Sequence, residues 1–153
     1  MTKKSTNIAA IAKKDLESMS QLFVSVFSNS PWNEHWQYNW AYERLNWVYQ
    51  SQGFVGFVAQ DKDITIGAIL GCSVPFQGKK GFKIIEFFVA TDYQHRGVGT
   101  RLLNTIELEL EQRNYDFISL LTSKDSAAES FYLKRNYMPN DKLILLRKNV
   151  DRI

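Results

Sequence analysis

The stretch Gln94-His95-Arg96-Gly97-Val98-Gly99-Thr100 lies between two segments of different periodicity. Residues 82–90 precede it and are rich in β-branched and aromatic side chains, which is typical of a strand. Behind it, apolar residues recur at helical spacing, namely Leu102, Leu103, Ile106 and Leu110. The sequence therefore predicts a strand, a short loop with two glycines, and the start of a helix.

Such a loop is suited to binding an anion. The first turn of a helix carries unpaired N–H donors and the positive end of the helix dipole. Gly97 and Gly99 let the backbone approach a ligand, and Arg96 adds a forked cation suited to phosphate oxygens. A dinucleotide fingerprint needs a third glycine, and a Walker loop needs Lys followed by Ser or Thr. An ordinary strand-to-helix turn remains the alternative to a diphosphate site.

Two blocks of sequence resemble the GNAT superfamily of acyl-CoA-dependent N-acyltransferases. The first is Gln94-His95-Arg96-Gly97-Val98-Gly99, which resembles the family's Gln/Arg-x-x-Gly-x-Gly/Ala signature and follows the strand residues Glu86-Phe87-Phe88-Val89. The second is Ala128-Glu129-Ser130-Phe131-Tyr132-Leu133-Lys134-Arg135-Asn136-Tyr137, which resembles the family's Ala-x-x-x-Phe-Tyr ending. Within this resemblance, the weaker similarity of Pro31-Trp32-Asn33-Glu34 is to aminoglycoside-type acetyltransferases.

The resemblance implies that acetyl-CoA is the cosubstrate. The residues that it implies for binding are Phe88, Val89, Gln94, His95, Arg96, Gly97, Val98, Gly99, Thr100, Asp125 and Lys134. In the family, the segment at Phe88 to Ala90 pairs with the pantetheine arm, and a backbone N–H near Val89 would stabilise the thioester oxyanion.

Glu86 and Tyr132 are the candidate catalytic residues. Glu86 lies in an otherwise apolar strand, and a family acid on this strand often removes the proton of the acceptor amine through water. Tyr132 occupies the family position of the acid that protonates the leaving thiolate. The alternatives are an ion-paired or solvent-facing strand residue for Glu86, and a packing tyrosine for Tyr132.

Two positions depart from the family pattern. Asp125 stands where many members have Asn, and an acid cannot donate like an amide. Asn136 replaces a usual Gly, but Asn tolerates the left-handed conformation, so we expect the turn to survive. The spacing of His35 and His95 predicts no metal site, and Cys72 on an apolar strand face does not indicate thiol catalysis.

The whole chain reads as one α/β domain over residues 1–153. Its 44% hydrophobic and 23% charged residues are globular values, and a net charge of +3 is too small to argue for nucleic acid. No apolar stretch is long enough to span a membrane, and the single cysteine fits a reducing compartment, so we expect a cytoplasmic protein. The resemblance implies a GNAT-like fold, with a mixed, mostly antiparallel central sheet flanked by helices.

Local patterns predict the other elements. Asp15 is the expected N-cap of a helix over residues 16–27, and a second helix is expected at about 34–52. Alternation and turn residues predict strands at 7–12, 54–60, 64–74, 117–122 and 142–150, with a short helix at 127–135.

The helix expected at 34–52 has two apolar stripes. Trp36, Trp40 and Trp47 form one, and the opposite stripe, Tyr38, Tyr42, Leu45 and Tyr49, is assigned to the core. The Trp stripe is left for a ligand cleft, a homodimer contact or a covering loop. We expect Trp32, Glu34, Trp36 and Trp40 to bind the acceptor, because aromatic faces and a carboxylate suit a cationic amine. For Trp47 we expect a partner or core contact.

Two functional hypotheses follow. The first is an N-acetyltransferase that moves an acetyl group from acetyl-CoA to a primary amine of a small cationic or amino-sugar-like molecule, or to a protein amine. The second is a non-catalytic acyl-CoA-binding module, to which Asp125 gives some support.

Overall fold

A computed structural model describes residues 6–152. Two compact units divide the chain, the first ending at Leu121 and the second beginning at Thr122. The first unit contains five strands, β1 (Thr6–Ala10), β2 (Val55–Asp61), β3 (Ile64–Phe76), β4 (Lys79–Val89) and β5 (Phe117–Leu120). Its α-helices are α1 (Leu16–Phe27), α2 (Tyr38–Tyr49) and α3 (Val98–Gln112), and the second unit contains α4 (Ala127–Leu133).

The five strands form one sheet in the order β1-β2-β3-β4-β5. The first four pair antiparallel with their neighbours, whereas β4 and β5 pair in parallel. The parallel pair needs a crossover connection, which α3 supplies. The predicted α/β class with a mixed, mostly antiparallel sheet is therefore confirmed.

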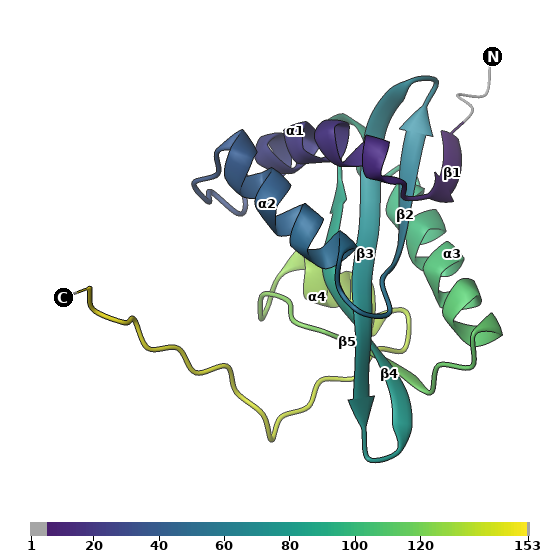
Figure 1. Cartoon of the computed structure of the whole chain (residues 1–153), viewed down its shortest axis with the longest axis vertical. Helices are drawn as coiled ribbons and strands as arrows, with labels where there is room; N and C mark the ends of the chain where they lie inside the picture. The colour runs from purple at the N-terminus through teal and green to yellow at the C-terminus, as the bar shows by residue number, and fades with distance from the viewer. Residues whose placement is uncertain (1–5, 153) are drawn as a thin grey trace. The chain divides into compact units, whose positions relative to one another are not determined.

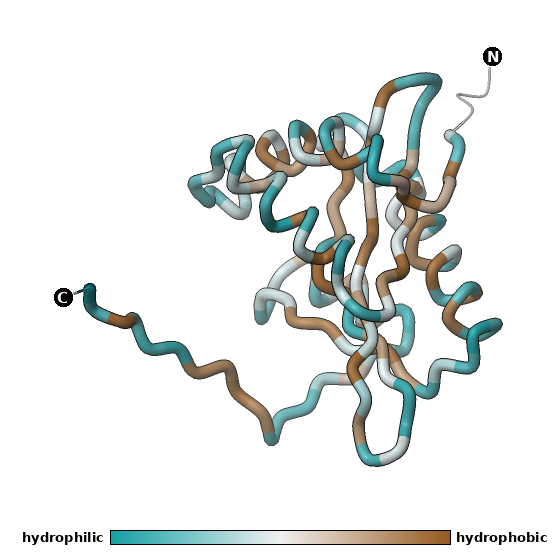
Figure 2. The backbone as a smooth tube through the Cα atoms, in the orientation of Figure 1, coloured by the Kyte–Doolittle hydropathy of each residue, from teal (hydrophilic) through white to brown (hydrophobic). Residues whose placement is uncertain are grey.

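Helices cover both faces of this sheet (Figure 1). On one face, α1 and α2 enclose a core whose sheet residues include Val58, Ala68, Leu70 and Phe88. On the other face lies α3, and the apolar row predicted for it is fully buried, namely Leu102, Leu103, Ile106 and Leu110. Hydrophobic residues accordingly follow the central strands and alternate with polar ones along α1 and α3 (Figure 2).

Helix α1 has the bounds that the sequence predicts, but Asp15 acts differently from a standard cap. Its carboxylate accepts a hydrogen bond from the N–H of Ala12 at 2.8 Å instead of from the first helical turn. Asp15 thus closes the turn that leads into the helix. The predicted apolar side of α1 is buried, from Leu16 to Phe27.

Helix α2 begins later than the predicted residue 34. The N–H of Glu34 bonds to the carbonyl of Phe27 at 2.8 Å, and Gln37 is extended, so the helix starts at Tyr38. Trp36 therefore lies before the helix, and the expected stripe of three tryptophans on one helix is wrong. The core side of α2 is made by Ala41, Leu45 and Val48, whereas Tyr38 is exposed, contrary to its core assignment.

The closing strand predicted at residues 142–150 is also wrong, because no strand forms there. Asn140 offers the chain a local alternative. Its side-chain oxygen accepts a hydrogen bond from the N–H of Lys142 at 3.1 Å, and its backbone carbonyl accepts one from the N–H of Leu143 at 3.2 Å. Side-chain bonds of this kind compete with strand pairing.

Candidate active site

Strand β4 places Glu86 on the face of the sheet that α1 and α2 cover. Cross-strand partners share a face, and Glu86 pairs with Leu70 while Phe88 pairs with Ala68. Leu70, Ala68 and Phe88 all belong to the core under α1 and α2. Ile85 is the extra residue of a β-bulge, since Leu70 pairs with Glu86 and Gly71 with Ile84. Bulges of this kind re-aim side chains and are frequent beside active sites.

The Glu86 carboxylate is nearly buried and forms an ion pair. Its side chain is 10% exposed, and its Oε1 accepts a hydrogen bond from Nε of Arg44 on α2. Burial raises the pKa of Glu86 above its ordinary value, Arg44 acts in the opposite direction, and the negative charge of Glu34 raises it further. A carboxyl with a raised pKa is better matched to proton transfer near neutral pH than an ordinary one.

An aromatic cluster lies beside this carboxylate. Phe88 meets Phe23 at 5.5 Å and Phe27 at 6.0 Å between ring centroids. Trp36 packs edge-on against Phe23 at 4.7 Å, and Trp32 packs against Phe27 at 5.5 Å. Both tryptophans are half-buried, so they form an apolar wall that excludes water on one side and leaves part of each ring accessible.

Glu34 contacts the aromatic wall at Trp36 and adds a second negative charge near Glu86. Its Oε1 accepts a hydrogen bond from Nε1 of Trp36 at 3.0 Å, and its side chain is exposed. Its negative charge contributes to the raised pKa of Glu86. The structure thus brings together four of the predicted site residues, which are Trp32, Glu34, Trp36 and Glu86.

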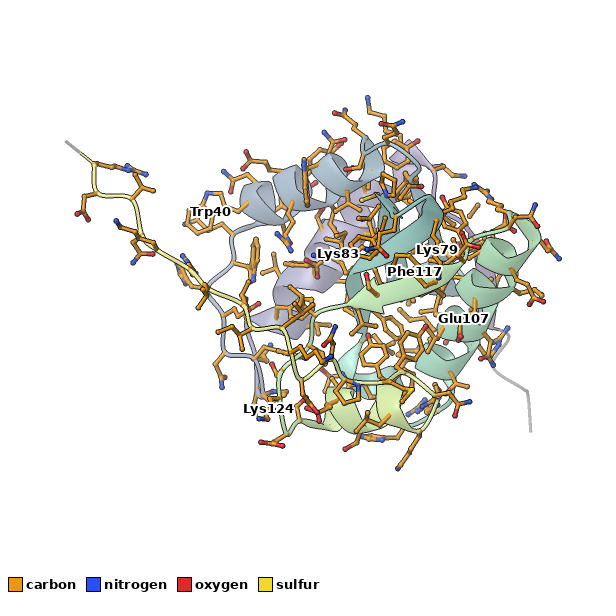
Figure 3. The ribbon with its side chains drawn as sticks, turned by 90° about the horizontal axis from the view of Figure 1, so that it is seen from below. Trp40, Lys79, Lys83, Glu107, Phe117 and Lys124 are labelled. Carbon is orange, nitrogen blue, oxygen red and sulfur yellow. The ribbon has the colours of Figure 1, made fainter. Side chains whose placement is uncertain are left out.

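Trp40 and Trp47 are separate from this group. Trp40 is 42% exposed on the first turn of α2, with its ring 5.9 Å from that of His35, and it points away from the sheet (Figure 3). Trp47 is 56% exposed, so the core contact expected as one alternative for it is wrong.

In the loop before α3, the backbone enters the helix through a left-handed residue. Gly97 adopts φ +82° as the N-cap residue, and a side chain at this position would project into open space. His95 also has a positive φ, of 61°. The first bond within the helix runs from the N–H of Arg101 to the carbonyl of Gly97, so the amides of Val98 and Gly99 precede the first helical donor.

Side chains around this loop are tied to the sheet. Nε2 of Gln94 donates to the carbonyl of Val89 at 3.1 Å. The Arg96 guanidinium lies 5.4 Å from the centre of the Tyr93 ring, and the Tyr93 hydroxyl donates to Asp61 at 2.6 Å. These contacts hold the loop next to the end of β4 and keep Arg96 exposed.

Strand β4 separates from β5 before it reaches this loop. The parallel pairing joins residues 81–84 to residues 117–120 and ends there, whereas β4 continues beside β3 to Val89. In the described chain, no strand pairs with the β5 side of β4 around Val89. The binding of a pantetheine arm along Phe88 and Val89 by strand-like pairing therefore stays a prediction.

The second unit carries the remaining predicted residues on and around α4. Ser126 caps this helix by accepting from the N–H of Glu129 at 3.1 Å, and the N–H of Asp125 donates to the Glu129 carboxylate at 2.8 Å. The Tyr132 ring contacts Phe131 and Tyr137, each at 5.4 Å. Asn136 adopts φ 68°, as expected for a residue in place of Gly, and Lys134 is the exposed C-cap.

Sequence reasoning missed Arg44. It lies 42 residues from Glu86 in the chain, and only the folded α2 brings it to the carboxylate. A carboxylate within an apolar strand signals that a cation is near, but it does not say which one. Among residues 6–152, no cluster of His, Cys, Asp or Glu has the geometry of a metal site. No helix in that range is long and apolar enough to span a membrane.

Residues 16–137 match the Acetyltransferase (GNAT) family. The chain belongs to this family of acetyltransferases. The matched range contains the whole segment from α1 to the turn after α4, including both sequence blocks that suggested the resemblance. A search of curated proteins finds no match.

Solved structures share the GNAT fold with this chain at low identity. An aminoglycoside acetyltransferase, meta-AAC0020 from an uncultured soil metagenomic sample, solved with sisomicin, is 18% identical with a TM-score of 0.75, covering 95% of this chain and 97% of that one. AAC(6')-Iy, solved with a bisubstrate analogue of CoA and acetylneamine, is 15% identical with a TM-score of 0.74, covering 95% and 99%. A possible acetyltransferase from Clostridium difficile 630 is 13% identical with a TM-score of 0.80, also covering 95% and 99%.

Proposed function

We propose that this protein transfers the acetyl group of acetyl-CoA to a primary amine of a small cationic or amino-sugar-like molecule. The observation that carries the proposal is the nearly buried Glu86 carboxylate on β4, the strand that leads into the glycine loop. A base and an anion-binding loop on consecutive segments are what direct attack on a CoA thioester requires.

In this mechanism, Glu86 removes a proton from the acceptor ammonium, directly or through one water. The freed amine attacks the thioester carbonyl carbon, the C–N bond forms, the nitrogen loses its second proton to water, and the C–S bond breaks to release the CoA thiolate. A backbone N–H near Val89 would stabilise the negative charge on the carbonyl oxygen. The diphosphate of CoA would bind the amides at the start of α3, next to Arg96.

Tyr132 is the proposed acid that returns a proton to the thiolate of CoA. Its support is its position in the family-like block, together with a hydroxyl that stays protonated at neutral pH. Asp125 and Lys134 are proposed CoA contacts on the same grounds. For Asp125 the contact would use an accepting oxygen, since its carboxylate cannot donate and its N–H already donates to Glu129.

The proposed acceptor class rests on the wall around Glu86. Trp32 and Trp36 offer aromatic surface, and Glu34 adds a carboxylate that attracts an ammonium group. Two of the similar structures are aminoglycoside acetyltransferases, which supports a polyamine sugar as the first acceptor to test. Trp40 is proposed at the outer edge of the same site.

The test is thiol release from acetyl-CoA with a panel of amines, comprising aminoglycosides, simple amino sugars, linear polyamines and a peptide with a free N-terminus. We expect turnover with at least one cationic small molecule and none with the matched alcohols. If the peptide is the one member of the panel that is acetylated, the acceptor is a protein amine and not a small molecule. Tight CoA binding without turnover on any amine would support the binding-module hypothesis instead.

A further inference from the structure

The ion pair of Glu86 was an alternative in the sequence, but its partner, Arg44, was not predicted. Arg44 lies on α2, and Glu86 lies on β4 under it. The Arg44 side chain is 40% exposed, whereas that of Glu86 is 10% exposed. The pair therefore joins a buried acid to a cation that reaches solvent.

The contact uses only part of the carboxylate. Nε of Arg44 donates to Oε1, and within residues 6–152 the second oxygen, Oε2, has no hydrogen-bond partner. An ionised carboxylate has two oxygens with about four acceptor positions, so Oε2 can still accept a proton from an amine or a water. Fixing Oε1 restricts the rotation of the carboxylate and thereby sets the direction of Oε2.

We propose that Arg44 is a positioning residue that keeps Glu86 ionised and holds its Oε2 toward the acceptor amine. This inference rests on the proposed function, because it takes Glu86 as the base. According to this inference, α2 as well as β4 contributes a residue that the base needs, because Arg44 lies on α2.

The charges around Glu86 support this role. Burial against the aromatic cluster disfavours the charged carboxylate, and Glu34 in the segment before α2 adds a like charge. On the other packed elements, β3 places Leu70 opposite Glu86, and α1 contributes Phe23 and Phe27 beside Phe88. Arg44 is the one group among these residues that favours the ionised form. Without it, the acid would be protonated over more of the neutral pH range.

The experiment compares the pH dependence of kcat/KM for the wild-type protein, Arg44→Gln and Arg44→Lys. For Arg44→Gln, we expect the acidic limb of the kcat/KM profile to move to higher pH, with a loss on that limb of about tenfold for each pH unit of displacement and the wild-type value above it. Arg44→Lys keeps the charge and should recover part of the loss. Arg113→Gln is the matched control, since Nε of Arg113 donates to Glu109 at 2.8 Å on the surface of α3, and its profile should not move.

An NMR titration tests the inference without turnover and without an Arg44 variant. The Nε–H signal of Arg44 should shift with the same midpoint as the Glu86 carboxyl carbon in the wild-type protein, and Glu86→Gln should remove that shift. A pH-independent Arg44 signal, or an Arg44→Gln profile that parallels the wild type, would overturn the role of Arg44. Full activity of Glu86→Gln would instead refute the assignment of Glu86 as the base, whereas no turnover of the wild-type protein with any amine would refute the proposed function.

Discussion

The region around Glu86 and the loop before α3 are built in different ways. Around Glu86, side chains from α1, α2, β4 and the segment between the helices pack on one another, as in the contacts of Phe23 with Trp36 and of Arg44 with Glu86. The loop instead depends on backbone conformation within a few consecutive residues, with Gly97 at φ +82° and exposed side chains at Arg96 and His95. The first region depends on tertiary packing, and the second on local sequence.

This difference predicts opposite responses to mutation. Changes in the loop should alter CoA binding while the fold persists. Changes among the packed side chains should alter stability together with acceptor use.

The largest expected effect is on CoA binding in Gly99→Val. Gly99 lies in the first turn of α3, where Val has a better intrinsic helix propensity than Gly, so the protein should remain folded. The added side chain would keep the diphosphate from the helix amides, and we expect calorimetric binding of CoA to be lost. Unchanged CoA affinity in a folded Gly99→Val protein would show that the loop is an ordinary turn.

Trp36→Ala and Trp40→Ala should separate the packed region from its surroundings. Trp36 is half-buried against Phe23, so its removal should cost about 2–4 kcal/mol of unfolding free energy, somewhat less than for a fully buried ring. Trp40 is exposed, and its removal should change stability by less than about 0.5 kcal/mol.

Chemical denaturation measures the unfolding free energy of both tryptophan variants. Steady-state kinetics then measure the KM of each variant for the acceptor amine. We expect both variants to raise KM for the amine while the affinity for acetyl-CoA stays the same. A Trp40→Ala protein with unchanged KM would remove Trp40 from the acceptor site. If its mass in sedimentation depended on concentration differently from wild type, the exposed face of α2 would be a homodimer contact instead.

Arg96→Ala should weaken CoA binding less than Gly99→Val does. A hydrogen bond to a charged group contributes about 1.5–3 kcal/mol, so CoA affinity should fall about 10- to 150-fold. Arg96 is exposed and packs only near Tyr93, so the melting temperature should hardly change. A large loss of stability without a loss of affinity would mean that Arg96 supports the loop and does not contact CoA.

The same contrast explains what the sequence could predict. The glycine loop, α1, α3 and the strands up to β5 follow local periodicity and turn residues, and they form as expected. The left-handed turn at Asn136 was also predictable, because it depends on one residue type. These features need no knowledge of distant contacts.

The sequence predictions that were wrong or incomplete have two causes. Either a local hydrogen bond competes with the expected helix or strand, or the contact joins residues that are far apart in the chain. Helix α2 begins later than predicted because the N–H of Glu34 bonds to the carbonyl of Phe27. At the start of the segment 142–150, the N–H groups of Lys142 and Leu143 bond to Asn140 and not to a neighbouring strand. Arg44 was missed because its partner is 42 residues away. A pattern along the chain carries no information about which cation meets a buried acid.

The most direct test of the account is the turnover of Glu86→Gln with an amine that the wild-type protein acetylates. Loss of a general base predicts a kcat about 10²- to 10⁴-fold lower at neutral pH, partly recovered at higher pH because more of the amine is already deprotonated. CoA affinity should be unchanged, and Glu43→Gln, which alters an exposed acid on α2, is the matched control. Wild-type turnover by Glu86→Gln at neutral pH would contradict the assignment of Glu86 as the base.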